Sequence, residues 1–122
     1  MKNDLVIKKC NICGAIIKVI NNKGIIKCCG QDMQVMVPNS VDCSVEKHVP
    51  TYERVEDEIY VKVNHVMEKE HYIEWITLIA DNKECTTILY PEQDADARFK
   101  YIPGSTIYAY CNKHGLWKVD VE

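Results

Sequence analysis

From residue 46 onward, the chain is a series of short apolar segments separated by polar and turn-forming residues. Residues 59–63 alternate between apolar and polar side chains, as a half-buried strand does. Residues 72–80 and 85–90 are rich in β-branched and aromatic residues, which are common in strands. Further strands are predicted at 98–102, 106–110 and 116–121. Residues 37–122 are therefore predicted to form an all-β, immunoglobulin-like sandwich, with the acidic segment 52–58 as a solvated loop or strand edge.

The first 36 residues have the pattern of a second, much smaller β domain. Strands are predicted at residues 5–7 and 16–20, followed by a hairpin turn at Asn21–Gly24 and a strand at 25–26. A unit of this size has too little core to fold without a covalent or metal cross-link. Residues 37–45 are expected to be a linker, so the domains are predicted at 1–36 and 37–122.

Four cysteines of the small domain form two close groups. Cys10 and Cys13 make a C-x2-C motif, and Cys28 and Cys29 are adjacent. Four thiolates in two groups suit a tetrahedral site for zinc or a single iron; two disulfides or plain buried thiols are the alternatives. Neighbouring side chains on a strand point to opposite faces, so Cys28 and Cys29 can reach one metal only if the backbone bends between them.

Composition narrows the class of protein. The 122 residues are 47% hydrophobic and 27% charged, which predicts a packed core. Seven cysteines, odd in number and clustered, favour metal ligation over a disulfide framework. A formal net charge of -3 argues against nucleic acid as the main partner. The chain shows no signal-peptide pattern and no long apolar run, so a cytoplasmic location without membrane insertion is expected.

The chain contains only four histidines, and the spacing of two of them is informative. His65 and His71 are six residues apart, which on a strand places them roughly 20 Å from each other. On a helix they are about 240° apart around the axis and diverge. Only a loop that folds back brings both imidazoles to one ion.

The other two histidines lie in segments that can converge on this loop. Cys111 and His114 are expected to share a tight turn closed by Gly115, and His48 lies in an extended segment before Pro50. Four imidazoles and one thiolate exceed the four ligands of a closed structural zinc site. Such a set leaves one octahedral position open, and imidazole with thiolate suits iron. A second metal centre that binds a small anion is predicted.

Three motifs together carry a family resemblance. They are Glu46-Lys47-His48-Val49-Pro50, His65-x5-His71-Tyr72-Ile73-Glu74-Trp75 and Cys111-Asn112-x-His114-Gly115-Leu116-Trp117. They resemble the superoxide reductases, and the N-terminal cysteines resemble desulforedoxin, so the chain is similar to the two-iron desulfoferrodoxin type over nearly its whole length. Val66 stands where members of this family often have proline, which affects the expected loop path rather than the ligands.

The resemblance implies two irons per chain. One would be held by Cys10, Cys13, Cys28 and Cys29, and the other by His48, His65, His71 and His114 as equatorial ligands with Cys111 as the axial one. The implied activity is one-electron reduction of superoxide to hydrogen peroxide, using electrons from an external donor such as rubredoxin.

The resemblance also implies roles beyond the metal ligands. Lys47 would attract the anion and support protonation, and Glu46 would occupy the sixth position in the oxidised state. A homodimer is expected. The competing hypothesis is a non-catalytic, rubredoxin-like electron-transfer or zinc-binding protein. Cys43 and Cys85 remain outside both sites and are predicted to be small buried hydrophobic residues; a disulfide between them is the alternative, which a reducing cytoplasm disfavours.

Overall fold

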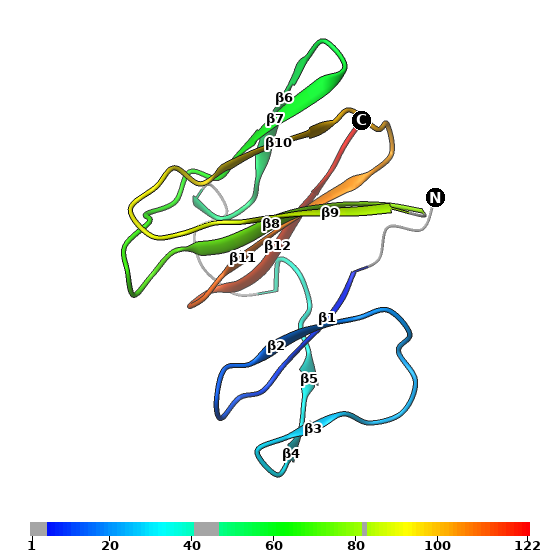
Figure 1. Ribbon diagram of the computed structural model, residues 1–122, viewed down its shortest axis with the longest axis vertical. Coiled ribbons are helices and arrows are strands. Elements are labelled where there is room, and N and C mark those ends of the chain that lie inside the picture. Colours follow the sequence, from blue (N-terminus) through cyan, green and yellow to red (C-terminus); the bar gives the residue numbers. More distant parts are fainter. Residues whose placement is uncertain (1–4, 41–46, 82) are drawn as a thin grey trace. The chain divides into compact units, whose positions relative to one another are not determined.

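The computed structural model describes residues 5–40, 47–81 and 83–122. The chain divides into two compact units, with the boundary between Val37 and Pro38 (Figure 1). The regular elements of both units are strands, which confirms the all-β class. Within the described ranges, no helix has the length and apolar character needed to span a membrane.

The small unit is built around a hairpin. Strand β1 (Val6–Lys9) pairs antiparallel with β2 (Ile16–Val19) on one side and with β5 (Gln34–Val35) on the other. A second ladder joins β3 (Lys27–Cys28) to β4 (Gln31–Asp32). Among the described residues of this unit, the buried hydrophobic side chains are Ile7, Cys10 and Met33. So small a core agrees with the expectation that the unit needs a cross-link.

The predicted hairpin at Asn21–Gly24 is wrong. The strand β2 ends at Val19, residues 25 and 26 are not in a strand, and Ile25 is 72% exposed. The real hairpin joins β1 to β2, and its turn is the C-x2-C segment itself. Residues 20–26 instead form a connection that returns the chain to Cys28 beside this turn. Convergence of the cysteines therefore overrides the local turn signal.

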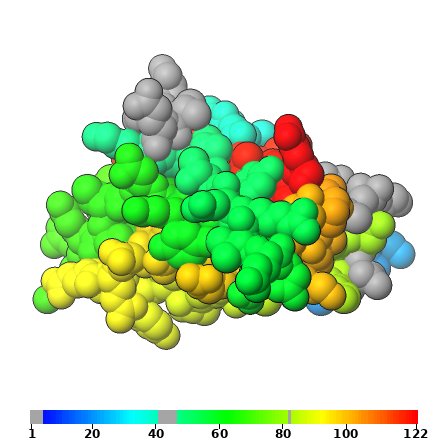
Figure 2. All heavy atoms as spheres, turned by 90° about the horizontal axis from the view of Figure 1, so that it is seen from above, coloured from blue at the N-terminus to red at the C-terminus, as the bar shows by residue number. Residues whose placement is uncertain are grey.

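The large unit consists of two antiparallel sheets. The first has the order β10-β7-β6, with β6 (Thr51–Val55), β7 (Glu58–Lys62) and β10 (Asp96–Lys100). The second has the order β12-β11-β8-β9, with β8 (Ile73–Ala80), β9 (Lys83–Ile88), β11 (Thr106–Cys111) and β12 (Gly115–Asp120). Of the two alternatives predicted for the acidic segment, the structure shows the strand edge: β6 is a mostly exposed edge strand. In Figure 2, the residues of this region are the green spheres.

The core lies between these two sheets. Along β7, the buried Ile59 and Val61 alternate with side chains that are partly or fully exposed, as the sequence pattern predicted. From the other sheet, Ile76 of β8 and Ile107 of β11 are fully buried in the same cluster. Strands β8 and β11 stay paired as far as Cys111, with a shift of register between Tyr110 and Cys111. The packed core therefore holds in place the end of the sheet that carries this cysteine.

We expect Ile76→Ala to lower the free energy of unfolding of the large unit by about 2–5 kcal/mol, because it leaves a cavity between the sheets. Ile88→Ala is the matched control, since Ile88 lies on the neighbouring strand β9 and is 58% exposed. Chemical denaturation followed by tryptophan fluorescence measures both. Equal losses in the two variants would contradict this description of the core.

Candidate metal centres

The four cysteines of the small unit lie together, two in the turn between β1 and β2 and two at the end of β3, and we call them the cysteine cluster: Cys10, Cys13, Cys28 and Cys29. The Sγ atoms of Cys13 and Cys28 are 3.6 Å apart, and those of Cys28 and Cys29 are 3.9 Å apart. Sulfurs placed tetrahedrally at about 2.3 Å from one ion are separated by about 3.8 Å. The spacing therefore fits one tetrahedral metal ion.

The backbone bend that the adjacent cysteines require is present. Strand β3 ends at Cys28, and both Cys29 and Gly30 have positive φ angles, 55° and 77°. This left-handed conformation is unusual for a residue with a side chain. The turn allows both thiols to face the same point, although the two residues are adjacent in the chain.

The protonation of the cysteine cluster is uneven. The backbone N–H of Cys13 donates to Cys10 Sγ at 3.5 Å, and this contact, with that of the Ile12 backbone, lowers the pKa of Cys10 to about 6. Hydrogen bonding with the Cys13 side chain raises the pKa of Cys28 to about 12 and also raises that of Cys29. Without a cation the cluster keeps thiol protons that metal binding must release.

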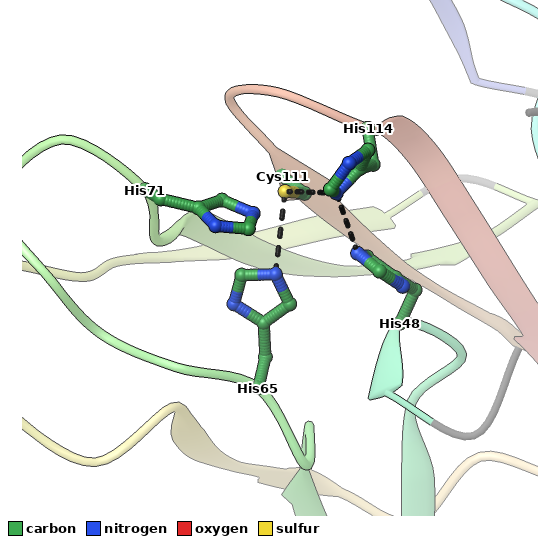
Figure 3. Close-up of side chains that lie close together, drawn as sticks. All are labelled: His48, His65, His71, Cys111 and His114. Carbon is green, nitrogen blue, oxygen red and sulfur yellow. Dashed lines mark hydrogen bonds between the residues drawn. The ribbon is translucent and has the colours of Figure 1, made fainter. Parts of the chain in front are cut away.

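A second cluster occupies one end of the sandwich (Figure 3), and we call it the histidine–cysteine cluster: His48, His65, His71, Cys111 and His114. Each member offers a ligand atom, and these atoms all lie within 4.8 Å of one another. Cys111 ends β11 and His114 lies in the turn before β12. The other three histidines come from the segment before β6 and from the loop between β7 and β8.

The loop between β7 and β8 folds back, as the spacing of its two histidines predicted. Glu68 and His71 form an isolated antiparallel bridge, with both of their backbone N–H groups donating to the opposite carbonyl. His65 and His71 rings come within 4.6 Å of each other, centroid to centroid. The six-residue spacing thus becomes a short separation in space.

The inward-facing atoms can be assigned from their contacts. His65 Nδ1 lies 2.5 Å from the carbonyl oxygen of Val66, which leaves its Nε2 facing Cys111 Sγ at 3.4 Å. His48 Nε2 lies 3.0 Å from His114 Nδ1. Two nitrogens that each lie about 2.1 Å from one ion, with a nitrogen–ion–nitrogen angle of about 90°, are also about 3 Å apart. The nitrogen spacing therefore fits ligation to one ion.

His71 supplies a separate test of this fit. Its Nε2 is buried and has no hydrogen-bond partner among the described residues. A buried polar atom without a partner is destabilising unless something else satisfies it. A cation bound between the five side chains would accept the lone pair of this nitrogen, so the residues present fit a metal ion.

Trp117 supports two members of the cluster. Its ring stacks on His48 at 4.9 Å between centroids, and its Nε1–H donates to the carbonyl oxygen of His114 at 3.0 Å. Gly115, with φ of 84°, closes the turn between Cys111 and His114 as expected. Trp117 belongs to the motif that begins at Cys111, but the sequence alone did not indicate this supporting role. Its position three residues after His114 was the available signal.

Burial sets the protonation of the histidine–cysteine cluster. It lowers the pKa of His65 and of His71, which favours the neutral imidazole that a metal needs. It also raises the pKa of Cys111, which is fully buried. Without a cation Cys111 is therefore held as a thiol, and metal binding at this cluster would displace its proton.

The remaining residues singled out in the sequence do not belong to either cluster. Lys47 is exposed beside the buried His48. Glu46 and Cys43 lie outside the described residues. Cys85 was predicted to be buried, and this is wrong: it is an exposed free thiol. It lies on β9, an edge strand of its sheet. A side chain on an edge strand has a neighbouring strand on one side only, so an apolar residue there can remain exposed.

The fold and the two clusters define a class of protein: a small cysteine-rich β module followed by a β-sandwich with a histidine–cysteine site. Comparison with known proteins identifies the family. The family model described as Desulfoferrodoxin matches residues 40–120, and that described as Desulfoferrodoxin, N-terminal domain, matches residues 3–36. The chain belongs to the desulfoferrodoxin family.

Individual relatives match over almost the full chain. The desulfoferrodoxin of Desulfarculus baarsii is 44% identical, covering 98% of this chain and 99% of that protein. The desulfoferrodoxin of Syntrophotalea carbinolica is 42% identical, covering 96% and 97%. Among solved structures, the superoxide reductase of Treponema pallidum matches with a TM-score of 0.74 over 96% of this chain and 99% of that one. Its 24% sequence identity makes this a likeness of fold alone.

Proposed function

We propose that the protein is a superoxide reductase, which reduces superoxide by one electron to hydrogen peroxide. The observation that carries the proposal is the convergence of four imidazoles and one cysteine on one point. Five protein ligands exceed those of a closed zinc site and leave room for one further ligand. Membership of the desulfoferrodoxin family supports the same activity, and so do solved relatives of 25–27% identity that are named superoxide reductase.

The proposed cofactors are two iron ions per chain. The histidine–cysteine cluster would hold one, since imidazole and thiolate together suit iron. The cysteine cluster would hold the other in an all-sulfur site. When bound at the histidine–cysteine cluster, ferrous iron supplies the electron for the reaction, and in this proposal an external rubredoxin-like donor restores it.

The residues of the chain would hold the iron, attract the superoxide anion and support its protonation. Superoxide, one electron and two protons balance to hydrogen peroxide. Cys111 and the four histidines would hold the iron, with Cys111 as a thiolate and the histidines as neutral imidazoles. The Lys47 ammonium would attract the anion and donate a hydrogen bond to it. Glu46, outside the described residues, is proposed to occupy the sixth position in the oxidised protein.

We expect Lys47→Ala to lower the second-order rate constant with superoxide roughly tenfold and to weaken its dependence on ionic strength, because a local charge is lost from the approach to the site. Pulse radiolysis over a range of salt concentrations measures both. Lys100→Ala is the matched control, because it removes the same charge from the exposed face of β10. A Lys47→Ala rate with unchanged magnitude and salt dependence would contradict the assignment.

We also propose that the two units are separate functional domains. Residues 1–36 would form the desulforedoxin-like iron domain and residues 37–122 the catalytic sandwich. Five large apolar side chains of the small unit are exposed: Ile12, Ile20, Ile25, Val35 and Val37. A homodimer is proposed, in which an interface between the two copies would cover such side chains. All six cysteines in the described part of the chain are free thiols, which suits a reducing cytoplasm.

Element analysis combined with a visible spectrum tests the proposed cofactors. Two irons per chain, one with the bands of a rubredoxin-like site and one with a thiolate-to-ferric band, are expected. Zinc at the histidine–cysteine cluster of the protein as isolated would favour the competing hypothesis of a non-catalytic metal-binding protein.

A further inference from the structure

Asn112 lies in the turn between Cys111 and His114, but its side chain contacts a different segment. Its Oδ1 accepts a hydrogen bond from the backbone N–H of Tyr72 at 3.0 Å, and its Nδ2 donates to the carbonyl oxygen of Glu70 at 2.9 Å. Its own backbone N–H donates to the carbonyl oxygen of Tyr72 at 3.3 Å. Three hydrogen bonds thus join this turn to the two residues that flank His71.

The backbone of His71 itself is held on its other side. Its N–H donates to the carbonyl oxygen of Glu68 at 3.2 Å, and its carbonyl oxygen accepts from the N–H of Glu68 at 3.1 Å. Those bonds stay within the loop and shape it. The bonds to Asn112, in contrast, fix the loop at His71 to the turn that joins Cys111 to His114.

His65, on the same loop, depends on different contacts. Its backbone N–H donates to the carbonyl oxygen of Val63 at 2.9 Å, and its ring contacts the carbonyl of Val66. Both partners are its near neighbours in the chain. Loss of Asn112 should therefore disturb His71 far more than His65.

We propose that Asn112 is a positioning residue, which holds His71 at the correct distance from Cys111 and His114 for all three to bind one metal ion. The inference rests on the metal site within the proposed function, but not on the reaction with superoxide. A side-chain amide is suited to this role, because it presents one acceptor and one donor in a fixed fork. Aspartate keeps the acceptor for Tyr72 but sets a carboxylate oxygen against the carbonyl of Glu70.

Residues that orient metal ligands typically contribute 10–100-fold to metal affinity. We expect Asn112→Ala to weaken metal binding at the histidine–cysteine cluster by about this factor, and Asn112→Asp by less. The matched control is Asn39→Gly. Asn39 also bonds a backbone through both ends of its amide, accepting from Lys118 N–H at 2.9 Å and donating to Lys118 C=O at 3.4 Å. Its φ is 58°, a conformation that glycine adopts readily.

The experiment is a Zn²⁺ titration of the full-length, metal-free protein, in competition with a chelator and followed by NMR of the imidazole resonances. All four histidines of the chain belong to this one cluster, so these resonances report it without interference from the cysteine cluster. In Asn112→Ala we expect the weaker affinity together with a His71 resonance that stays close to its metal-free position, while His48 and His65 still shift. Asn39→Gly should lose stability but keep the affinity of the unchanged protein.

The inference is overturned if Asn112→Ala and Asn112→Asp bind Zn²⁺ within twofold of the unchanged protein and His71 still shifts. It is also overturned if Asn39→Gly loses as much affinity, since general destabilisation would then explain the effect. Should Asn112→Ala fail to fold, Asn112→Asp alone decides, through the response of His71 relative to His65. A zinc-binding, Asn112-dependent site in a protein without superoxide activity would refute the proposed function and leave this inference standing.

Discussion

Replacing Cys111 with serine should abolish superoxide reduction. Cys111 is fully buried at the end of β11, with its Sγ 3.4 Å from His65 Nε2 and 3.8 Å from His114 Nδ1. A serine hydroxyl does not ionise near neutral pH and cannot replace the thiolate as a ligand. Because the loss of a residue that merely orients a ligand can reduce activity 10–100-fold, the loss of a ligand should cost on the order of 100-fold or more.

The Cys111→Ser variant should also lose the thiolate-to-ferric absorption of the second centre while keeping the spectrum of the cysteine cluster. Stopped-flow mixing with superoxide and a visible spectrum of the oxidised protein measure the two effects. Cys85→Ser is the control, because Cys85 is an exposed free thiol outside both clusters. A Cys111→Ser protein that reduced superoxide at the normal rate would show that this residue is not a ligand.

Removing the metal from the cysteine cluster should unfold the small unit and leave the sandwich folded. The described residues of the small unit include only three buried hydrophobic side chains, Ile7, Cys10 and Met33. In comparably small metal-bound domains, metal binding supplies about 10–16 kcal/mol that the core cannot. The sandwich, in contrast, has a continuous core between its two sheets and does not depend on this metal.

The Cys13→Ser variant removes one of the four proposed ligands of the cysteine cluster. It should therefore release the metal from this cluster and leave the metal of the sandwich in place. Hydrogen exchange should show residues 5–37 exchanging rapidly and strands β8 and β11 remaining protected. Retained protection of β1 and β2 would contradict a metal-dependent fold. If superoxide turnover disappeared while the second iron stayed bound, a purely structural role for the cysteine cluster would be excluded, and electron relay would be the remaining role.

Much of the sandwich could be predicted from the sequence, because its strands have local signals. The alternation at residues 59–63 and the β-branched segment at 72–80 correspond closely to β7 and β8. The fold-back of the loop between His65 and His71 followed from distance alone, since no regular element brings residues six apart to one point. The exchange of hydrogen bonds between Glu68 and His71 is the local means by which the loop folds back.

The errors arose where long-range contacts override local patterns. The turn signal at Asn21–Gly24 is real, but the cysteines determine where the chain goes next. Cys85 was expected to be buried, yet it lies on an edge strand, and edge position is a property of sheet order rather than of local sequence. The bonds from Asn112 to Glu70 and Tyr72 span about forty residues of sequence, so no spacing rule indicated them.

The most direct test of the proposed function is the amount of hydrogen peroxide formed when the fully reduced, iron-loaded protein receives a pulse of superoxide without any electron donor. A reductase consumes one stored electron for each superoxide ion. We predict one peroxide per superoxide and the oxidation of one protein-bound iron for each superoxide consumed. One peroxide for every two superoxide ions, with oxygen released and no net oxidation of iron, would identify a dismutase and contradict the proposed function.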